Sequence, residues 1–164
     1  MSVNIRKRVD GPGNADHVAD AWALKERIRE SEGVLKQRRG FFEDAYRRST
    51  THLLFESPGD ADEEERLVGF ASARRDGYIL FLAVAPEARG RGYGKHLVAE
   101  VADDNRSVTC HARASNGAAL DFYDHLGFEV QRQISNYYED GGDAYYLKLG
   151  GAGGLTERLS EFLR

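Results

Sequence analysis

Hydrophobic and polar positions alternate along the chain with two different periods. Segments in which apolar residues run continuously or alternate with polar ones predict β-strands, and segments in which they recur every three to four residues predict helices. The strand pattern occurs at 3–9, 51–57, 66–75, 78–85, 107–114, 128–138 and 143–149. The helical pattern occurs at 16–30, 41–49, 94–105 and 116–126.

This order of elements predicts an α/β (α+β) domain over residues 1–149. We expect a single mixed central sheet of about six to seven strands with helices on both faces. The near-continuous apolar run YILFLAVA at 78–85 is expected to be a central strand. Residues 150–164 are expected to form a glycine-rich linker and a short C-terminal amphipathic helix, because their apolar residues share one helical stripe.

Composition and charge narrow the class of protein. No apolar run is long enough to span a bilayer and residues 1–10 lack the apolar core of a signal peptide, so we expect a cytoplasmic protein without a membrane partner. The formal net charge of −4 argues against a nucleic-acid partner. Cys110 is the only cysteine, which excludes an internal disulfide and a zinc cluster of the usual kind, and we expect no metal site. Cys110 itself is expected to be a small buried strand residue.

The turn RGRGYGK at 89–95 carries the first candidate chemistry, because it follows a strand and opens a helix. Its three glycines lack side chains, so successive backbone N–H groups can converge on an anion at a helix N-terminus. From the residues alone, the same glycines also fit the steric needs of a strand–helix connection. The turn lacks the Lys-Ser or Lys-Thr of a P-loop, and it does not sit in the βαβ unit of a dinucleotide-binding fold.

The segment LAVAPEARGRGYGKHLV at 82–98 resembles the cofactor-binding segment of the GNAT N-acetyltransferases. The family pattern Arg/Gln-x-x-Gly-x-Gly/Ala is matched by Arg89, Gly92 and Gly94. The resemblance implies the GNAT fold and acetyl-CoA as the cofactor, with its pyrophosphate on the backbone of the turn and its pantetheine arm along the preceding strand. The residues that it implies for cofactor binding are Leu82, Ala83, Val84, Arg89, Gly90, Arg91, Gly92, Tyr93, Gly94, Lys95, Asn116 and Tyr123.

The segment RASNGAALDFYDHLGFEV at 113–130 resembles the second signature of the same family. The resemblance implies that Asn116 opens a helix near the cofactor and that Tyr123 protonates the departing thiolate as a general acid. A phenol with a reference pKa of about 10 keeps its proton at neutral pH, so it can serve in this role. The helical spacing alone also fits Tyr123 as a core aromatic, because apolar residues share its helix.

Acetyl transfer to an amine also needs a base, because an ammonium group has no lone pair. His111 suits this role, since a histidine has a reference pKa of about 6.5. From the residues alone, a hydrogen-bonded strand histidine is equally consistent. If His111 is the base, we expect its side chain to face the acetyl group across from Tyr123.

The segment ISNYYEDGGDAYYLKL at 134–149 resembles the end of the protein N-terminal (Nα-) acetyltransferases, including the ribosomal-protein alanine acetyltransferase. Some eukaryotic members have a histidine base at the place of His111, acting through water, and Tyr78 matches a tyrosine that assists it. Tyr137 and Tyr138 match residues in the loop that covers the first residues of the peptide, and aromatic packing on a hairpin is the alternative for this pair. The Phe-Pro or Leu-Pro stretch frequent in this group is missing from RESEGVLKQRRGFF at 29–42, so no first-residue preference is implied. Glu32, Val34 and Leu35 are the candidates to line that pocket.

The sequence therefore predicts an enzyme that moves the acetyl group of acetyl-CoA to a primary amine by direct attack in a ternary complex. The preferred acceptor is the N-terminal α-amine of a protein or peptide, since an α-amine with a pKa near 8 is neutral in roughly a tenth of molecules at pH 7, against under a thousandth for lysine. A GNAT acetyltransferase of a small-molecule amine (polyamine, amino acid or antibiotic) and a non-catalytic acyl-CoA-binding module are the alternatives. Both a monomer and a homodimer are consistent with the sequence.

Overall fold

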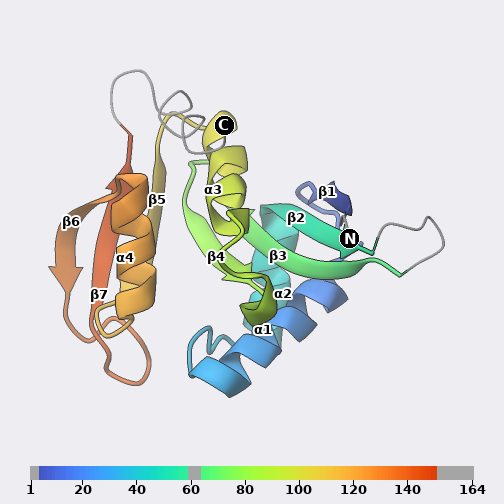
Figure 1. Ribbon diagram of the computed structural model, residues 1–164. Helices are drawn as coiled ribbons and strands as arrows, with labels where there is room; N and C mark the ends of the chain where they lie inside the picture. Colours follow the sequence, from blue (N-terminus) through green and yellow to red (C-terminus); the bar gives the residue numbers. More distant parts are fainter. Residues whose placement is uncertain (1–3, 59–63, 151–164) are drawn as a thin grey trace.

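A computed structural model describes residues 4–58 and 64–150 (Figure 1). The seven predicted strands are present as β1 (Asn4–Asp10), β2 (Thr50–Ser57), β3 (Arg66–Ala73), β4 (Ile79–Val84), β5 (Val108–Arg113), β6 (Glu129–Ile134) and β7 (Ala144–Leu149). The four predicted helices are present as α1 (Val18–Glu32), α2 (Arg39–Arg48), α3 (Tyr93–Asp103) and α4 (Gly117–Leu126), with a 3₁₀ turn at Pro86–Ala88. The helix expected after residue 150 lies outside the described residues. No helix in the described ranges combines the length and the apolar character needed to cross a bilayer.

The mixed α/β class is confirmed, but the expectation of one continuous sheet is wrong. Strands β1-β2-β3-β4 form one antiparallel sheet, and strands β5-β7-β6 form a second. Across the described residues, one parallel bridge between Tyr78 and Thr109 joins β4 to β5, and the strands then diverge (Figure 1). The run at 78–85 is thus central in the strand order but has one open edge. Apolar periodicity shows which strand faces are buried, and it does not specify which neighbour a strand pairs with.

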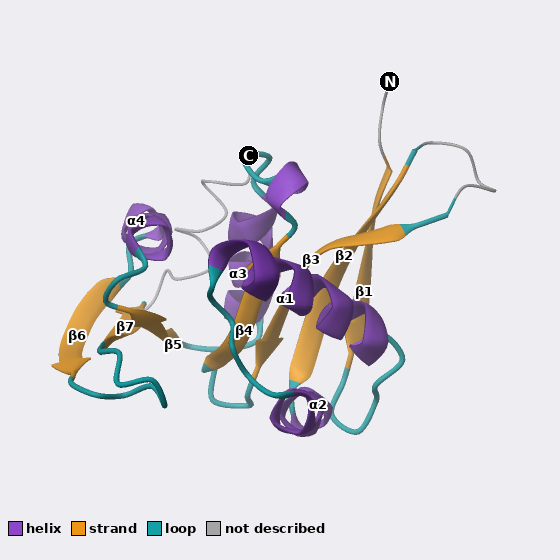
Figure 2. Ribbon diagram, turned by 90° about the horizontal axis from the view of Figure 1, so that it is seen from below, coloured by secondary structure: helices purple, strands orange, loops and turns teal. Residues whose placement is uncertain are grey.

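Helices cover both faces of the first sheet. The ring of Phe70 on β3 meets Phe42 of α2 with centroids 6.0 Å apart. The preceding residue, Gly69, points to the opposite face, where a Cβ would lie 3.1 Å from Leu97 of α3. Figure 2 shows α1 and α2 together on one side of this sheet and α4 beside the second sheet. The predicted arrangement of helices is therefore confirmed for the first sheet.

An aromatic cluster fixes α1 and α2 to the sheet. Phe42 is fully buried, and its ring lies 5.5 Å from Trp22, 6.1 Å from Tyr46 and 4.7 Å from Phe81, measured between centroids. Burial of one such ring stabilises a fold by roughly 1.5–3 kcal/mol. The loop between α1 and α2 is thereby held at the end of the molecule where β4 and β5 diverge (Figure 2).

The turn between β3 and β4 sets the start of β4 against β5. Its Gly77 has φ of +84°, a left-handed conformation, and its N–H donates to the Arg74 carbonyl at 3.0 Å. The Gly77 carbonyl accepts the N–H of Thr109 at 3.0 Å. A Cβ at this position would lie 2.2 Å from the carbonyl oxygen of Ser107. Only glycine fits here, because both the backbone conformation and the approach of the next strand exclude a side chain.

We therefore expect Gly77→Ala to lower the free energy of unfolding by about 2 kcal/mol, through backbone strain and the contact with Ser107. Urea denaturation followed by circular dichroism measures this. The matched control is Gly40→Ala in α2, where a Cβ meets nothing within 4 Å. We expect this control to leave the stability unchanged or to raise it by up to about 1 kcal/mol. Equal effects of the two substitutions would contradict the role of Gly77.

Candidate active site

The open edge of β4 presents backbone groups that no strand uses in the described part of the chain. The Ala85 N–H donates to Val68 on β3 at 2.8 Å, so the alternation along a strand directs the N–H and C=O groups of Leu82 and Val84 away from β3. The Val84 carbonyl accepts from Nε of Arg89 at 3.2 Å. This edge can therefore pair with an extended ligand that carries amides, as a further strand would.

The turn after β4 has a backbone geometry that could hold an anion. Gly90 and Gly92 have φ of +84° and +85°, and a Cβ on either would meet nothing within 4 Å, so these positions are open to a ligand. Gly92 is the N-cap of α3, whose first N–H groups have no partner inside the helix. Gly94 is required for a different reason, since a Cβ there would lie 2.9 Å from the ring of Phe122 on α4. Lys95 lies in the first turn of α3.

The side chains of the turn are held by carboxylates, which the sequence did not indicate. Arg89 pairs with Glu32 at the end of α1 at 2.9 Å. Arg91 pairs with Glu56 of β2 at 3.0 Å, and the Tyr93 hydroxyl donates to the same carboxylate at 3.2 Å. The Glu56 side chain is only 9% exposed, so it anchors the turn from beneath. The two arginines are therefore tied to carboxylates, while the N–H groups at the start of α3 have no partner inside the helix.

His111 lies in a pocket of tyrosines beside the bridge between the sheets. The hydroxyl of Tyr78 is 2.5 Å from His111 Nδ1, and the ring of Tyr137 stacks on the imidazole with centroids 4.3 Å apart. Burial lowers the pKa of His111 below 6.5, with a smaller effect from Arg132, so the imidazole is neutral at pH 7. Burial raises the pKa of Tyr78, which therefore keeps its proton. In the His111 tautomer that carries its hydrogen on Nε2, the Tyr78 hydroxyl donates a hydrogen bond to Nδ1. His111 is thus a neutral imidazole, held by Tyr78 and Tyr137, that could accept a proton.

Tyr123 lies on the other side of β5. Cys110 and His111 are consecutive strand residues, so their side chains point to opposite faces, and Tyr123 is beside the Cys110 thiol. Tyr123 is 8% exposed, and burial, followed by its interaction with Cys110, raises its pKa well above 10. Tyr78, which contacts His111, also lies near Tyr123 and contributes to raising its pKa. Cys110 and Tyr123 therefore lie on one face of β5 and His111 on the other, with Tyr78 near both His111 and Tyr123. That His111 faces the acetyl group across from Tyr123 stays a prediction.

Burial also raises the pKa of the Cys110 thiol, to about 12. The thiol is therefore neutral at physiological pH and does not act as a nucleophile. Its packing in the core fits the sequence-based expectation. Among residues 4–58 and 64–150, no three His, Cys, Asp or Glu side chains are grouped so that they could hold a metal ion.

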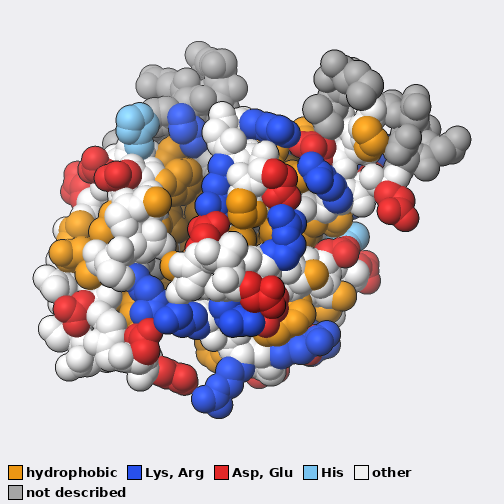
Figure 3. Space-filling model, turned by 60° about the horizontal axis from the view of Figure 1, so that its bottom comes forward, with side chains coloured by type: hydrophobic (Ala, Val, Ile, Leu, Met, Phe, Trp, Pro, Cys, Tyr) orange, Lys and Arg blue, Asp and Glu red, His pale blue; other side chains and the backbone are white. Residues whose placement is uncertain are grey.

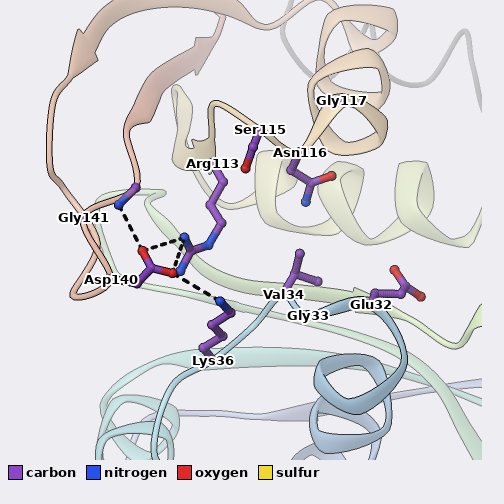
Figure 4. Close-up of a pocket in the computed structure, with 11 residues that line it drawn as sticks. Glu32, Gly33, Val34, Lys36, Arg113, Ser115, Asn116, Gly117, Asp140 and Gly141 are labelled. Atoms are coloured by element: carbon purple, nitrogen blue, oxygen red, sulfur yellow. Dashed lines mark hydrogen bonds and ion pairs between the residues drawn. The ribbon is translucent and has the colours of Figure 1, made fainter.

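A pocket of about 560 Å³ opens where the loop after α1, the end of β5, the start of α4 and the β6–β7 loop meet (Figure 4). Its lining residues are Glu32, Gly33, Val34, Lys36, Arg113, Ser115, Asn116, Gly117, Asp140, Gly141 and Gly142. Glu32 and Val34 are among these lining residues, whereas Leu35 packs against the core. Their role in a pocket for the first peptide residue stays a prediction. Asn116 caps α4, because its Oδ1 accepts the Ala119 N–H at 3.1 Å, and it also borders the pocket.

The sequence did not single out three charged residues of this pocket. Asp140 lies between Lys36 and Arg113, and its ion pairs with them measure 3.2 Å and 3.0 Å. The Arg113 guanidinium also lies 4.0 Å from the ring of Tyr138. The position of Asp140 in the turn EDGG marks it only as a loop residue, and no local pattern reveals partners far apart in the sequence.

A two-sheet α/β fold with an open strand edge, an open glycine-rich turn and an oriented histidine could hold a long, phosphate-bearing ligand beside a proton acceptor. Residues 19–128 match the family model described as the acetyltransferase (GNAT) family. The chain belongs to this family.

The curated relatives are N-acetyltransferases that the chain matches in part. N-alpha-acetyltransferase 30 of Xenopus laevis is 40% identical over 80 residues, which are 46% of this chain and 29% of that protein. An uncharacterized N-acetyltransferase of Methanocaldococcus jannaschii is 34% identical over 97 residues, 53% of this chain and 62% of that protein. The match thus spans less than two thirds of either relative.

Solved structures show the same fold at lower sequence identity. Arabidopsis thaliana NAA60 in complex with a bisubstrate analogue has a TM-score of 0.67 at 23% identity, covering 88% of this chain and 97% of that one. The ribosomal-protein-S18-alanine N-acetyltransferase from Escherichia coli has a TM-score of 0.66 at 21% identity, covering 90% and 97%. The predicted GNAT fold is therefore confirmed.

The environment of His111 predicts its titration. We expect the imidazole signal in an NMR pH titration to have its midpoint below 6.5, because burial and Arg132 both disfavour the charged form. Arg132 on β6 and His111 on β5 lie on either side of Tyr146 on β7, because Tyr146 is the cross-strand partner of both residues. The substitution Arg132→Gln removes this cation and should raise the midpoint of the His111 titration. A midpoint above 6.5 in the unmodified protein would contradict this account of the site.

Proposed function

We propose that this chain transfers the acetyl group of acetyl-CoA to the N-terminal α-amine of a protein or peptide. The contact of 2.5 Å between Tyr78 and a neutral His111, beside the open edge of β4, is the observation that carries this proposal. Membership of the acetyltransferase (GNAT) family supports the acetyl transfer. The matched relatives named N-alpha-acetyltransferase support the α-amine as acceptor.

Two backbone features fit acetyl-CoA. The pyrophosphate suits the N–H groups from Gly90 to the first turn of α3, and the amides of the pantetheine arm suit the open edge at Leu82 and Val84, with Ala83 turned toward β3. Asn116 stands at the start of α4, where the pocket opens. Bound acetyl-CoA supplies an activated acetyl thioester. Arabidopsis thaliana NAA60 has been solved in complex with acetyl-CoA, which supports this choice of cofactor.

His111 and Tyr78 are proposed to take the proton of the acceptor. An α-amine with a pKa near 8 is already neutral in roughly a tenth of molecules at pH 7, so a base as weak as a histidine suffices to accept its proton. The Tyr78 hydroxyl accepts the amine proton while passing its own proton to His111 Nδ1, 2.5 Å away. Because the pKa of Tyr78 is raised, the charge resides on the imidazolium and not on a phenolate.

Tyr123 is proposed to return a proton to the departing sulfur. Its raised pKa keeps the hydroxyl protonated, so it can donate a hydrogen bond to the developing thiolate and pass its proton as CoA leaves, after which Tyr123 takes a proton back from water. Because the neutral Cys110 thiol beside it is a poor acyl acceptor, the amine attacks the thioester directly in a ternary complex. Tyr137 and Tyr138 are proposed to hold the first residues of the peptide, since they lie above His111 and Arg113 on one face of β5.

Other sequence-based expectations stay predictions. These are the cytoplasmic location, the lack of nucleic-acid and membrane partners, and the state as a monomer or homodimer. The rival functions, acetylation of a small amine and binding of acyl-CoA without turnover, form separate arms of the test that follows.

The direct test is an acceptor screen with acetyl-CoA that measures released CoA. We expect peptides with free N-termini to be acetylated faster than polyamines, amino acids or aminoglycosides. The lowered pKa of His111 suits an α-amine, which is less basic than a lysine or polyamine amine, and Tyr137 and Tyr138 offer contacts to the residues that follow it. Transfer to small amines alone would replace the peptide assignment, and CoA binding without any transfer would support the non-catalytic alternative.

The base is tested with the best acceptor from that screen. We expect His111→Ala to lower kcat by roughly 10²–10⁴-fold and to remove the acidic limb of the pH–rate profile, with CoA affinity preserved. Tyr123→Phe should lower kcat but retain that limb, because it removes the proton donor and leaves the base. His125→Ala, an exposed histidine on α4, is the matched control and should behave as the unmodified protein. An acidic limb that persists in His111→Ala would remove His111 from the mechanism.

A further inference from the structure

The charged groups at the mouth of the pocket are arranged around one carboxylate. Asp140 accepts hydrogen bonds from Nη1 of Arg113 at 3.0 Å to each oxygen, from Nζ of Lys36 at 3.2 Å and from the N–H of Gly142 at 3.0 Å (Figure 4). These contacts hold the pKa of Asp140 well below its usual range, so the carboxylate is ionised. The cations come from the α1–α2 loop and from the end of β5, and Asp140 comes from the β6–β7 loop.

The cations lie next to the base. Arg113 is two residues after His111 on β5, so both side chains are on the same face, about 7 Å apart along the strand. Tyr137 stacks on His111, and Tyr138 lies over Arg113. A chain whose α-amine reaches His111 therefore has its next residues beside Lys36 and Arg113.

The positive charge of Lys36 and Arg113 exceeds the negative charge of Asp140. Two of the four charged lining residues are carboxylates, but Glu32 is already paired with Arg89. Lys36 and Arg113 thus share the single carboxylate of Asp140, which leaves one positive charge in a chain of formal net charge −4. Figure 3 shows Lys and Arg side chains interspersed with acidic ones on one face of the molecule.

The exposure of Asp140 allows another carboxylate to replace it as the partner of Lys36 and Arg113. Its side chain is 43% exposed, as is about half of the Lys36 side chain, while Arg113 is more buried at 18%. An ion pair this exposed exchanges readily, because solvent screens it and solvates the released group. The better buried Arg113 keeps its position in β5 when its partner changes.

We propose that Lys36 and Arg113 form a subsite for an acidic side chain at the second or third residue of the acceptor peptide. In this structure Asp140 is the internal stand-in for that side chain. The inference rests on the proposed function, because it assumes a peptide acceptor whose α-amine lies at His111. It adds a preference for acidic N-terminal sequences, and it identifies Lys36, Arg113 and Asp140 as specificity-determining residues.

The test compares three peptide series with the same first residue, carrying Glu, Gln or Lys at the second and third positions. We expect kcat/KM to fall in the order Glu, Gln, Lys, with roughly a tenfold difference between the extremes that shrinks in high salt. The difference should appear mainly in KM, since the subsite binds the acceptor and does not touch the reacting atoms. Equal values for all three series would overturn the inference while leaving the proposed function intact, whereas no transfer to any peptide would overturn both.

Substitutions in the chain distinguish a peptide-binding subsite from ion pairs that only hold the β6–β7 loop in position. Lys36→Met should reduce the preference for Glu, and Lys36→Arg should retain it. Asp140→Asn removes the internal competitor, so we expect KM for the Glu series to fall. A rise of KM for all three series in Asp140→Asn would show that Asp140 only holds the loop, and it would overturn the inference.

The matched control is Glu139→Gln, which removes a carboxylate from the adjacent residue. Glu139 pairs with Arg38 at 3.9 Å, both side chains are almost fully exposed, and neither residue lines the pocket. We expect the control to keep the order and size of the preference. The same change of preference in Glu139→Gln and Asp140→Asn would show a general effect of loop charge and would overturn the assignment to this site.

Discussion

The parallel bridge between Tyr78 and Thr109 is the point from which β4 and β5 diverge, and the candidate site is built around it. On one side of the bridge, the Gly77 carbonyl accepts the Thr109 N–H and so holds the two strands in contact. This close approach is possible because Gly77 has no side chain, which would strike the Ser107 carbonyl. On the other side, β4 keeps an open edge that an extended ligand can pair with. Tyr78 itself contacts His111, so the residue that joins the sheets also orients the imidazole.

Burial and paired carboxylates give the site its charge state. A partly buried His111 is neutral at pH 7 and the buried Tyr123 keeps its proton, so a base and an acid coexist without a charged pair in the core. At the glycine-rich turn, Glu32 and Glu56 hold the two arginines, and the first N–H groups of α3 stay available to an anion. The fixed amides need no side-chain ordering when an anion binds, which favours binding.

The order of elements was predictable from local periodicity, and the open turn at the start of α3 was predictable from its glycines. The division into two sheets was not, because the apolar run at 78–85 looks the same with a neighbour on one edge or on both. His111 was a candidate from its residue type, but its separation from Tyr123 follows from the alternation of β5 together with the packing of α4 on the Cys110 side. The contact of Asp140 with Lys36 joins residues 104 positions apart, and no local signal encodes it.

The central claim is that the open edge of β4 holds the extended arm of CoA while the turn holds its phosphates. Amide hydrogen exchange with and without CoA tests this most directly. The account predicts that CoA slows exchange at Leu82 and Val84, whose N–H groups face the open edge, and leaves Ala83, which faces β3, unchanged. CoA binding without slower exchange at Leu82 and Val84 would contradict it.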